Sequence, residues 1–180
     1  MGGKERNRLS KYITLIDRLQ EQASNQPHKR AFTFLDDGET ELDSLTYQQL
    51  NQKAKAIALV LQERNAQRQR ALLLYQPGLD FITAFLGCLY AGVVAVPVYP
   101  PRANRSIERL LAIVADAEAT FALTTQSIEE QVASKFSEHH ATEKIRFIAT
   151  DTVELDLATR SEERRVGKEC ITQCRSRWSP

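Results

Sequence analysis

The alternation of apolar and polar positions divides the chain into strands and helices that follow one another in turn. Continuous apolar runs, typical of strands covered on both faces, occupy residues 70–75, 93–99, 120–125 and 145–150. Apolar residues at helical spacing mark 9–23, 81–91 and the stretches that follow Thr46, Ser106 and Ser127. Between the helix of 9–23 and the helix that follows Thr46, the segment AFTFLDDGETELDSLT predicts a hairpin that turns at Asp37-Gly38.

This order predicts an α/β fold with a partial doubly wound, mainly parallel sheet, preceded by an N-terminal helix and a β-hairpin. A strand–helix–strand order favours parallel pairing through crossover helices. The proline in VVAVPVY suits the edge of that sheet better than its centre.

Local signals predict where the helices begin and end. Thr46 and Gln49 fit a capping box, and Leu45 and Leu50 are spaced for a hydrophobic staple. The other predicted caps are Asp80, Ser106 and a second capping box of Ser127 with Glu130, while Gly92 is placed to end the helix of 81–91. Small residues in that helix would let a neighbouring backbone approach closely: Ala84, Gly87, Cys88 and Ala91.

The composition indicates the cellular compartment and gives no support for some classes of partner. The formal net charge is +1 and 42% of the residues are hydrophobic, which gives no reason to expect nucleic acid as a partner. No apolar stretch is long enough for a membrane span, and no secretion signal follows the charged N-terminus. With only three cysteines, the cytoplasm is the expected compartment, and Cys88 is expected to be core packing.

Charge and periodicity divide the chain into three parts. Residues 1–8 are expected to be a flexible N-terminus, 9–159 an incomplete α/β domain, and 160–180 a non-native or disordered tail. The tail carries six basic and three acidic residues and shows neither helical nor strand periodicity. A nucleic-acid role for its basic residues and Trp178 is an open alternative, weakened by the interleaved Glu162 and Glu163.

Candidate chemistry along the chain is sparse. No glycine cluster follows a strand, so a phosphate-binding loop is not expected, and neither His139-His140 nor the pair Cys170 and Cys174 has partners to complete a metal site. No catalytic, cofactor-binding or metal-binding residue is therefore assigned. Four residues leave the carboxyl end of a predicted strand, where ligand crevices form in open α/β sheets. They are candidate pocket-lining residues, or else a rigid connector: Tyr99, Pro100, Pro101 and Arg102.

Two segments resemble signature motifs of the adenylate-forming, or AMP-binding, enzyme superfamily. LTYQQLNQKAKAIA (45–58) is similar to the first motif, and LYAGVVAVPVYPPR (89–102) is similar to the second. The exit VPVYPPR is most similar to the fatty-acyl-AMP ligases. ALLLYQPGLDFITAFLGCLYAG and SIERLLAIVADAEATFALTT follow the same pattern, so the resemblance runs from about Leu9 to about Asp151.

The resemblance implies the first subdomain of an enzyme that uses ATP and Mg²⁺ to turn a fatty acid into an acyl adenylate. In that family the acyl group commonly passes to an acyl carrier protein or polyketide synthase. The family's phosphate loop and catalytic lysine lie later in the chain and have no counterpart in these residues. The resemblance thus predicts an N-terminal fragment that binds no cofactor and is inactive alone. The alternative is a self-contained doubly wound binding domain without catalysis.

Overall fold

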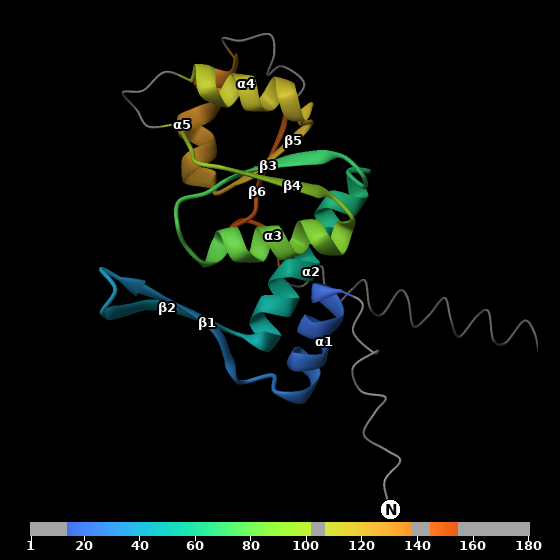
Figure 1. Ribbon diagram of the computed structural model, residues 1–180, viewed down its shortest axis with the longest axis vertical. Helices are drawn as coiled ribbons and strands as arrows, with labels where there is room; N and C mark the ends of the chain where they lie inside the picture. Colours follow the sequence, from blue (N-terminus) through green and yellow to red (C-terminus); the bar gives the residue numbers. More distant parts are fainter. Residues whose placement is uncertain (1–13, 102–106, 138–144, 155–180) are drawn as a thin grey trace, which may run out of the picture.

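Six strands and five helices make up the part of the chain that the computed structural model describes, residues 14–101, 107–137 and 145–154 (Figure 1). The predicted flexible N-terminus and the predicted tail lie outside these ranges. The elements in chain order are α1 (Leu15–Asn25), β1 (Arg30–Asp36), β2 (Thr40–Thr46), α2 (Tyr47–Glu63), β3 (Arg70–Leu74), α3 (Leu79–Ala91), β4 (Val94–Val98), α4 (Glu108–Ala117), β5 (Phe121–Thr124), α5 (Gln126–Ser137) and β6 (Arg146–Ala149).

The four later strands form one parallel sheet in the order β4-β3-β5-β6. Leu72 of β3 lies opposite Val96 of β4 on one side and Ala122 of β5 on the other. Helices cover both faces: α2 and α3 lie on one side of the strands, and α4 and α5 on the other (Figure 1). The prediction of a doubly wound, parallel α/β sheet is therefore confirmed.

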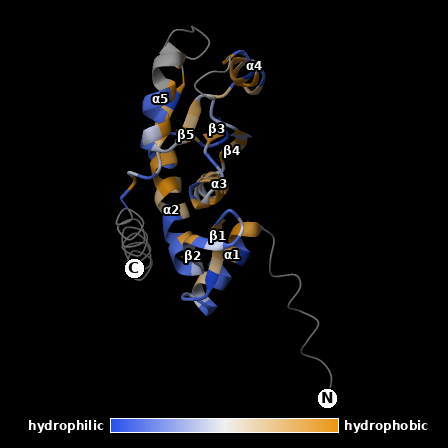
Figure 2. Ribbon diagram, turned by 90° about the vertical axis from the view of Figure 1, so that its left-hand side faces the viewer, coloured by the Kyte–Doolittle hydropathy of each residue, from blue (hydrophilic) through white to orange (hydrophobic). Residues whose placement is uncertain are grey.

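Alternate residues of the strands supply two separate cores. Leu73 and Leu123 pack with α2 and α3, whereas Leu72 and Ala122 pack with α4 and α5. This alternation follows from the two-residue period of a strand, and it explains why the central strands are apolar throughout. Figure 2 shows hydrophobic colours on β5 and mainly hydrophilic colours on the β1–β2 hairpin, which does not belong to this sheet.

The N-terminal helix and the hairpin are present as predicted, but the helix begins later. Leu15 is its first residue, because Thr14 and Asp17 form a capping box that the sequence interpretation missed. The earlier residues of the predicted helix, such as Leu9, lie outside the described residues. In the hairpin, Asp37 and Gly38 both adopt positive φ, as the predicted turn requires.

Helices α2 and α3 approach each other closely at Gly87. A Cβ atom at this position would lie 2.7 Å from Cγ2 of Ile57 and 3.2 Å from the carbonyl oxygen of Ala54. The predicted close approach is confirmed, and so is the capping box of Thr46 with Gln49 at the start of α2. Gly92 ends α3 in the left-handed conformation, with φ of 67°.

Two of the predicted helix starts need correction. Asp80 is not the cap of α3: the helix begins at Leu79 with Gly78 at the N-cap position, so Asp80 lies in its first turn. Ser127 is not a cap either, because α5 begins one residue before it. Ile107 occupies the N-cap position of α4, and the predicted cap Ser106 lies outside the described residues.

The cap of α5 comes from a distant part of the chain. Both carboxylate oxygens of Asp151, which follows β6, accept from the backbone N–H of Gln126, at 3.0 and 3.2 Å. The carboxylate therefore satisfies a free donor of the first helical turn and places negative charge at the positive end of the helix. No local sequence pattern near Gln126 predicts a capping residue that is 25 positions away in the sequence.

The two outer strands of the described sheet differ in how their outward backbone groups are kept from pairing with a further strand. In β4, the N–H of Val94 donates to the carbonyl of Gln69, toward β3. Successive N–H groups along a strand point to opposite sides, so the N–H that proline lacks at position 97 would have pointed outward, away from β3. In β6, the N–H of Arg146 donates toward β5, and the outward carbonyl of Phe147 accepts from Nη1 of Arg64 at 3.1 Å. The prediction that Pro97 belongs to an edge strand is confirmed.

Candidate functional site

The carboxyl ends of the four parallel strands lie along one edge of the sheet, where crevices for ligands form in α/β folds. There the chain leaves β3 at Tyr75, β4 at Tyr99 and β6 at Thr150. The structure thus brings together one residue that the sequence singled out, Tyr99, and two that it did not.

A chain of hydrogen bonds crosses this edge and fixes Tyr75. The hydroxyl of Thr150 donates to the carbonyl of Thr124 at 3.2 Å. Since a threonine hydroxyl has one hydrogen, the Tyr75 hydroxyl is the donor in its 2.7 Å contact with Thr150 Oγ1. Burial raises the pKa of Tyr75, so the hydroxyl stays neutral and keeps the proton that it donates to Thr150. The result is a neutral, buried ring whose hydroxyl is held by a hydrogen bond.

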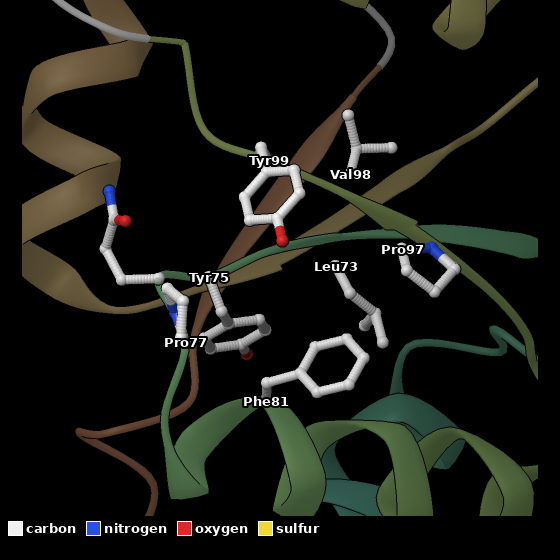
Figure 3. A pocket seen from close by; sticks show the side chains of 8 residues that line it. Leu73, Tyr75, Pro77, Phe81, Pro97, Val98 and Tyr99 are labelled. Carbon is white, nitrogen blue, oxygen red and sulfur yellow. The ribbon is translucent and has the colours of Figure 1, made fainter. Parts of the chain in front are cut away.

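A cavity of about 220 Å³ opens beside this ring, and we call it the Tyr75–Tyr99 cavity. Phe81 of α3 and Tyr99 at the end of β4 lie on opposite sides of the cavity (Figure 3). Pro77 and Pro97 line its two flanks. Phe81 also stacks on Phe85, with ring centroids 6.3 Å apart. The complete lining is Leu73, Tyr75, Gln76, Pro77, Phe81, Pro97, Val98 and Tyr99.

A second, wider cleft of about 860 Å³ continues from the first toward α4. It shares Tyr99 with the first cavity and adds Pro100 and Pro101 from the exit of β4 and Arg109 from α4. Three of the four candidate residues therefore line a cleft, and the fourth, Arg102, lies outside the described residues. Whether this segment lines a pocket of the longer enzyme stays a prediction.

The wall formed by Tyr75, Pro77 and Phe81 was missed at the sequence level. A usable signal existed: Tyr75 and Pro77 follow a strand that is parallel to β4, so they had to lie at the same edge as Tyr99. The sequence interpretation applied this rule to one strand end only.

The described residues offer binding surface rather than reactive groups. No three His, Cys, Asp or Glu side chains in the described ranges lie close enough together to hold a metal ion. Cys88 is fully buried in the core, as predicted, and burial raises the pKa of its thiol to about 12, which disfavours the nucleophilic thiolate. The other candidate metal ligands, His139-His140 and Cys170 with Cys174, lie outside the described residues. None of the described helices combines the length and apolar character that crossing a membrane takes.

Comparison with known proteins gives a consistent result. The family model described as AMP-binding enzyme matches residues 19–177. A medium-chain fatty-acid–acyl-carrier-protein ligase, JamA of Moorena producens, is 40% identical over 164 residues, which are 89% of this chain and 28% of JamA. The long-chain fatty-acid–AMP ligase FadD23 of Mycobacterium tuberculosis is 33% identical over 152 residues, 83% of this chain and 26% of FadD23.

Solved structures agree with these relatives. A fatty acyl-adenylate ligase from Legionella pneumophila, in complex with acyl adenylate and pyrophosphate, superposes with a TM-score of 0.69 and 38% identity. The match covers 81% of this chain and 25% of that structure. The chain thus spans about a quarter of the length of the relatives that it matches, and corresponds to their N-terminal part.

Proposed function

Because the chain belongs to the family of AMP-binding enzymes, we propose that it is the N-terminal segment of a fatty-acyl-AMP ligase. The intact enzyme would join a fatty acid to ATP, forming an acyl adenylate and releasing pyrophosphate. The observation that carries this proposal is the 38% identity, over 81% of the chain, to a structure that contains acyl adenylate and pyrophosphate. The cytoplasm is the compartment that we expect.

The acceptor of the acyl group is the least constrained part of the proposal. The relatives include ligases named for an acyl carrier protein, for AMP and for CoA. We favour an acyl carrier protein, alone or within a polyketide synthase. Support comes from the VPVYPPR exit, and from JamA, whose name specifies this acceptor, having 40% identity against 34% for a relative named for CoA.

ATP and Mg²⁺ are the cofactors of the intact enzyme in this proposal, but the described residues do not fit them. They offer neither a group of acidic or histidine ligands for a metal nor a glycine-rich loop for a triphosphate. We therefore propose that this chain alone does not catalyse adenylation and that its contribution is the scaffold beside the active site.

The first experiment measures fatty-acid-dependent exchange of pyrophosphate into ATP by the purified 180-residue chain. We expect no exchange above the background without enzyme, while the Legionella ligase serves as the positive control. Exchange by this chain that depends on fatty acid would contradict the proposed inactivity.

A second experiment tests membership in the ligase machinery directly. Residues 15–151 of this chain replace the matching segment of the Legionella ligase, and the chimera is assayed for the same exchange. We expect activity to be retained, because the two segments share their fold. A chimera that also carries Gly87→Val is the matched negative control, since it disturbs the α2–α3 contact. A monodisperse, folded chimera without exchange activity would contradict the proposal.

A self-contained binding domain remains the second candidate, and one observation favours it. Both faces of the sheet are covered by helices within the described residues, so the sheet has its own two-sided core. This function predicts a single cooperative unfolding transition and a monodisperse monomer. A segment that needs the rest of an enzyme instead predicts self-association through uncovered surface. Analytical ultracentrifugation with thermal unfolding separates the two.

A further inference from the structure

We propose that the Tyr75–Tyr99 cavity is a binding site for an uncharged apolar group, an aromatic ring or a short alkyl chain, inserted from the side of Tyr99. The proposal does not depend on acyl-adenylate formation. It concerns a property of the described residues themselves, so it stands or falls separately from the proposed function.

The cavity is deep as well as apolar. Leu73 and Tyr75 line it although their exposed fractions are only 1% and 4%, so the cavity reaches the buried surface of the sheet. Tyr99 lines its mouth with 78% of its surface exposed. A large aromatic side chain held in this way at the rim of a cleft gains a partner when an apolar group enters beneath it.

The walls are preformed. Pro77 and Pro97 have fixed φ on the two flanks, and the hydrogen bond to Thr150 holds the Tyr75 ring. A ligand that enters therefore has to order little besides the Tyr99 side chain, and low ordering cost favours binding to a small site.

The size of the cavity suits a compact apolar group. Its volume of about 220 Å³ exceeds the ~150 Å³ of an engineered apolar cavity that binds benzene in another protein. Benzene itself, toluene or the last few carbons of an alkyl chain therefore fit.

The electrostatic surroundings exclude a negatively charged group from the interior. The lining side chains are apolar or uncharged. Moving a carboxylate into this space would cost its desolvation, with no cationic side chain in the lining to compensate. A fatty acid that uses the site must consequently enter with its hydrocarbon end first.

The test is an NMR titration of the full chain with toluene, observing the methyl groups of Leu73 and the rings of Tyr75 and Phe81. We expect saturable shifts confined to these groups. Octanoate should compete with toluene through its alkyl end, and acetate should not. Shifts that do not saturate, or competition by acetate, would overturn the proposal.

Two variants give the titration its controls. Tyr99→Ala removes an exposed wall and should weaken toluene binding about tenfold without unfolding the chain. Leu42→Ala, on the hairpin, removes a side chain that is 65% exposed, and it should leave binding unchanged. If Tyr99→Ala binds toluene as the wild type does, or if Leu42→Ala weakens binding equally, the site is not this cavity.

Thr150 is a positioning residue in this proposal. Thr150→Val removes the acceptor of the Tyr75 hydroxyl and should weaken binding about threefold. Thr150→Ser keeps the hydroxyl and should bind as the wild type does. A Thr150→Ser variant as weak as Thr150→Val would show that the methyl group, not the hydrogen bond, supports the Tyr75 wall.

Discussion

The two faces of the parallel sheet are covered by helix pairs that are held in different ways. On one face, α2 and α3 carry their own start and stop signals, Thr46 with Gln49 and Gly92, and touch at Gly87. On the other face, α4 begins without a side-chain cap, as α3 does, and α5 takes its cap from the distant Asp151. The start of α2 is therefore specified by neighbouring residues, whereas the start of α5 depends on the fold.

This difference separates local from tertiary determination of helix ends. A capping box joins residues three positions apart and forms as soon as the helix does. The bond from Gln126 to Asp151 exists only after β6 has paired with β5, because that pairing brings residue 151 beside the start of α5. The α4–α5 layer should accordingly form later and open more easily than the α2–α3 layer.

The largest expected effect breaks the contact between α2 and α3. Gly87→Val places methyl groups where a Cβ alone would already lie 2.7 Å from Ile57 Cγ2, so the helices must separate. We expect the free energy of unfolding to fall by about 3 kcal/mol, in the upper part of the range for overpacking. Urea denaturation measures it.

Gly78→Ser is the matched control for that substitution. A Cβ at Gly78 meets nothing nearer than the Gln76 carbonyl at 3.9 Å, and its backbone is extended. Serine also favours the N-cap position, so we expect a gain of about 0.3 kcal/mol. If both variants lost the same stability, the close approach at Gly87 would not be the cause.

The next effect reports how dry the α2–α3 face is. Burial raises the pKa of Cys88 from 9.0 to about 12. Above pH 9 the unfolded thiol loses its proton while the folded thiol keeps it, so stability falls as pH rises toward 12. We expect this thiol to lower the free energy of unfolding on the order of 1 kcal/mol per pH unit there.

Denaturation of the chain in a Cys170→Ser, Cys174→Ser background, with and without Cys88→Ala, isolates the Cys88 contribution. The stability difference between the two proteins should be constant below pH 9 and shift in favour of Cys88→Ala above it. A difference that stays constant up to pH 11 would show that water reaches the thiol.

Smaller effects compare the local cap with the tertiary cap. Thr46→Ala and Asp151→Ala should each lower the free energy of unfolding by about 1 kcal/mol, because each removes one acceptor from a helix start. Amide hydrogen exchange distinguishes them: Thr46→Ala should speed exchange in α2, and Asp151→Ala at Gln126 in α5. Faster exchange at Gln126 in both variants would mean that the two layers open together.

The smallest effect is expected for Ser127→Ala. A capping box of Ser127 with Glu130 would make this substitution cost about 1 kcal/mol, but α5 already includes Ser127. We expect a change within about 0.5 kcal/mol, typical of surface positions. A loss as large as that of Asp151→Ala would mean that α5 begins at Ser127 in solution.

The order of elements and the parallel sheet were predictable because they follow from periodicity. Alternation along β3 and the apolar stripe of α2 are properties of the sequence itself, and Pro97 excludes a central strand. The errors fall where a competing local choice exists. Asp80 and Ser127 are good caps by type, yet each lies inside a helix that begins earlier.

The candidate site was only half predictable. Tyr99 follows directly from the rule for strand ends, and Tyr75 could have been found in the same way. The link from Tyr75 to Thr150 spans 75 residues and depends on β5 lying between β3 and β6. No spacing in the sequence encodes that strand order, so neither the fixed ring nor the cavity beside it could be derived beforehand.

The outer strands have a consequence for crowded solutions. A second copy that added a strand beside β4 would forgo one backbone hydrogen bond at Pro97, and beside β6 it would have to displace Arg64 from the Phe147 carbonyl. Strand-by-strand templating, the first step toward a cross-β fibre, is thereby penalised in both directions. Pro97 and Arg64, at the two outer strands of the described sheet, would thus also disfavour fibril growth by this chain.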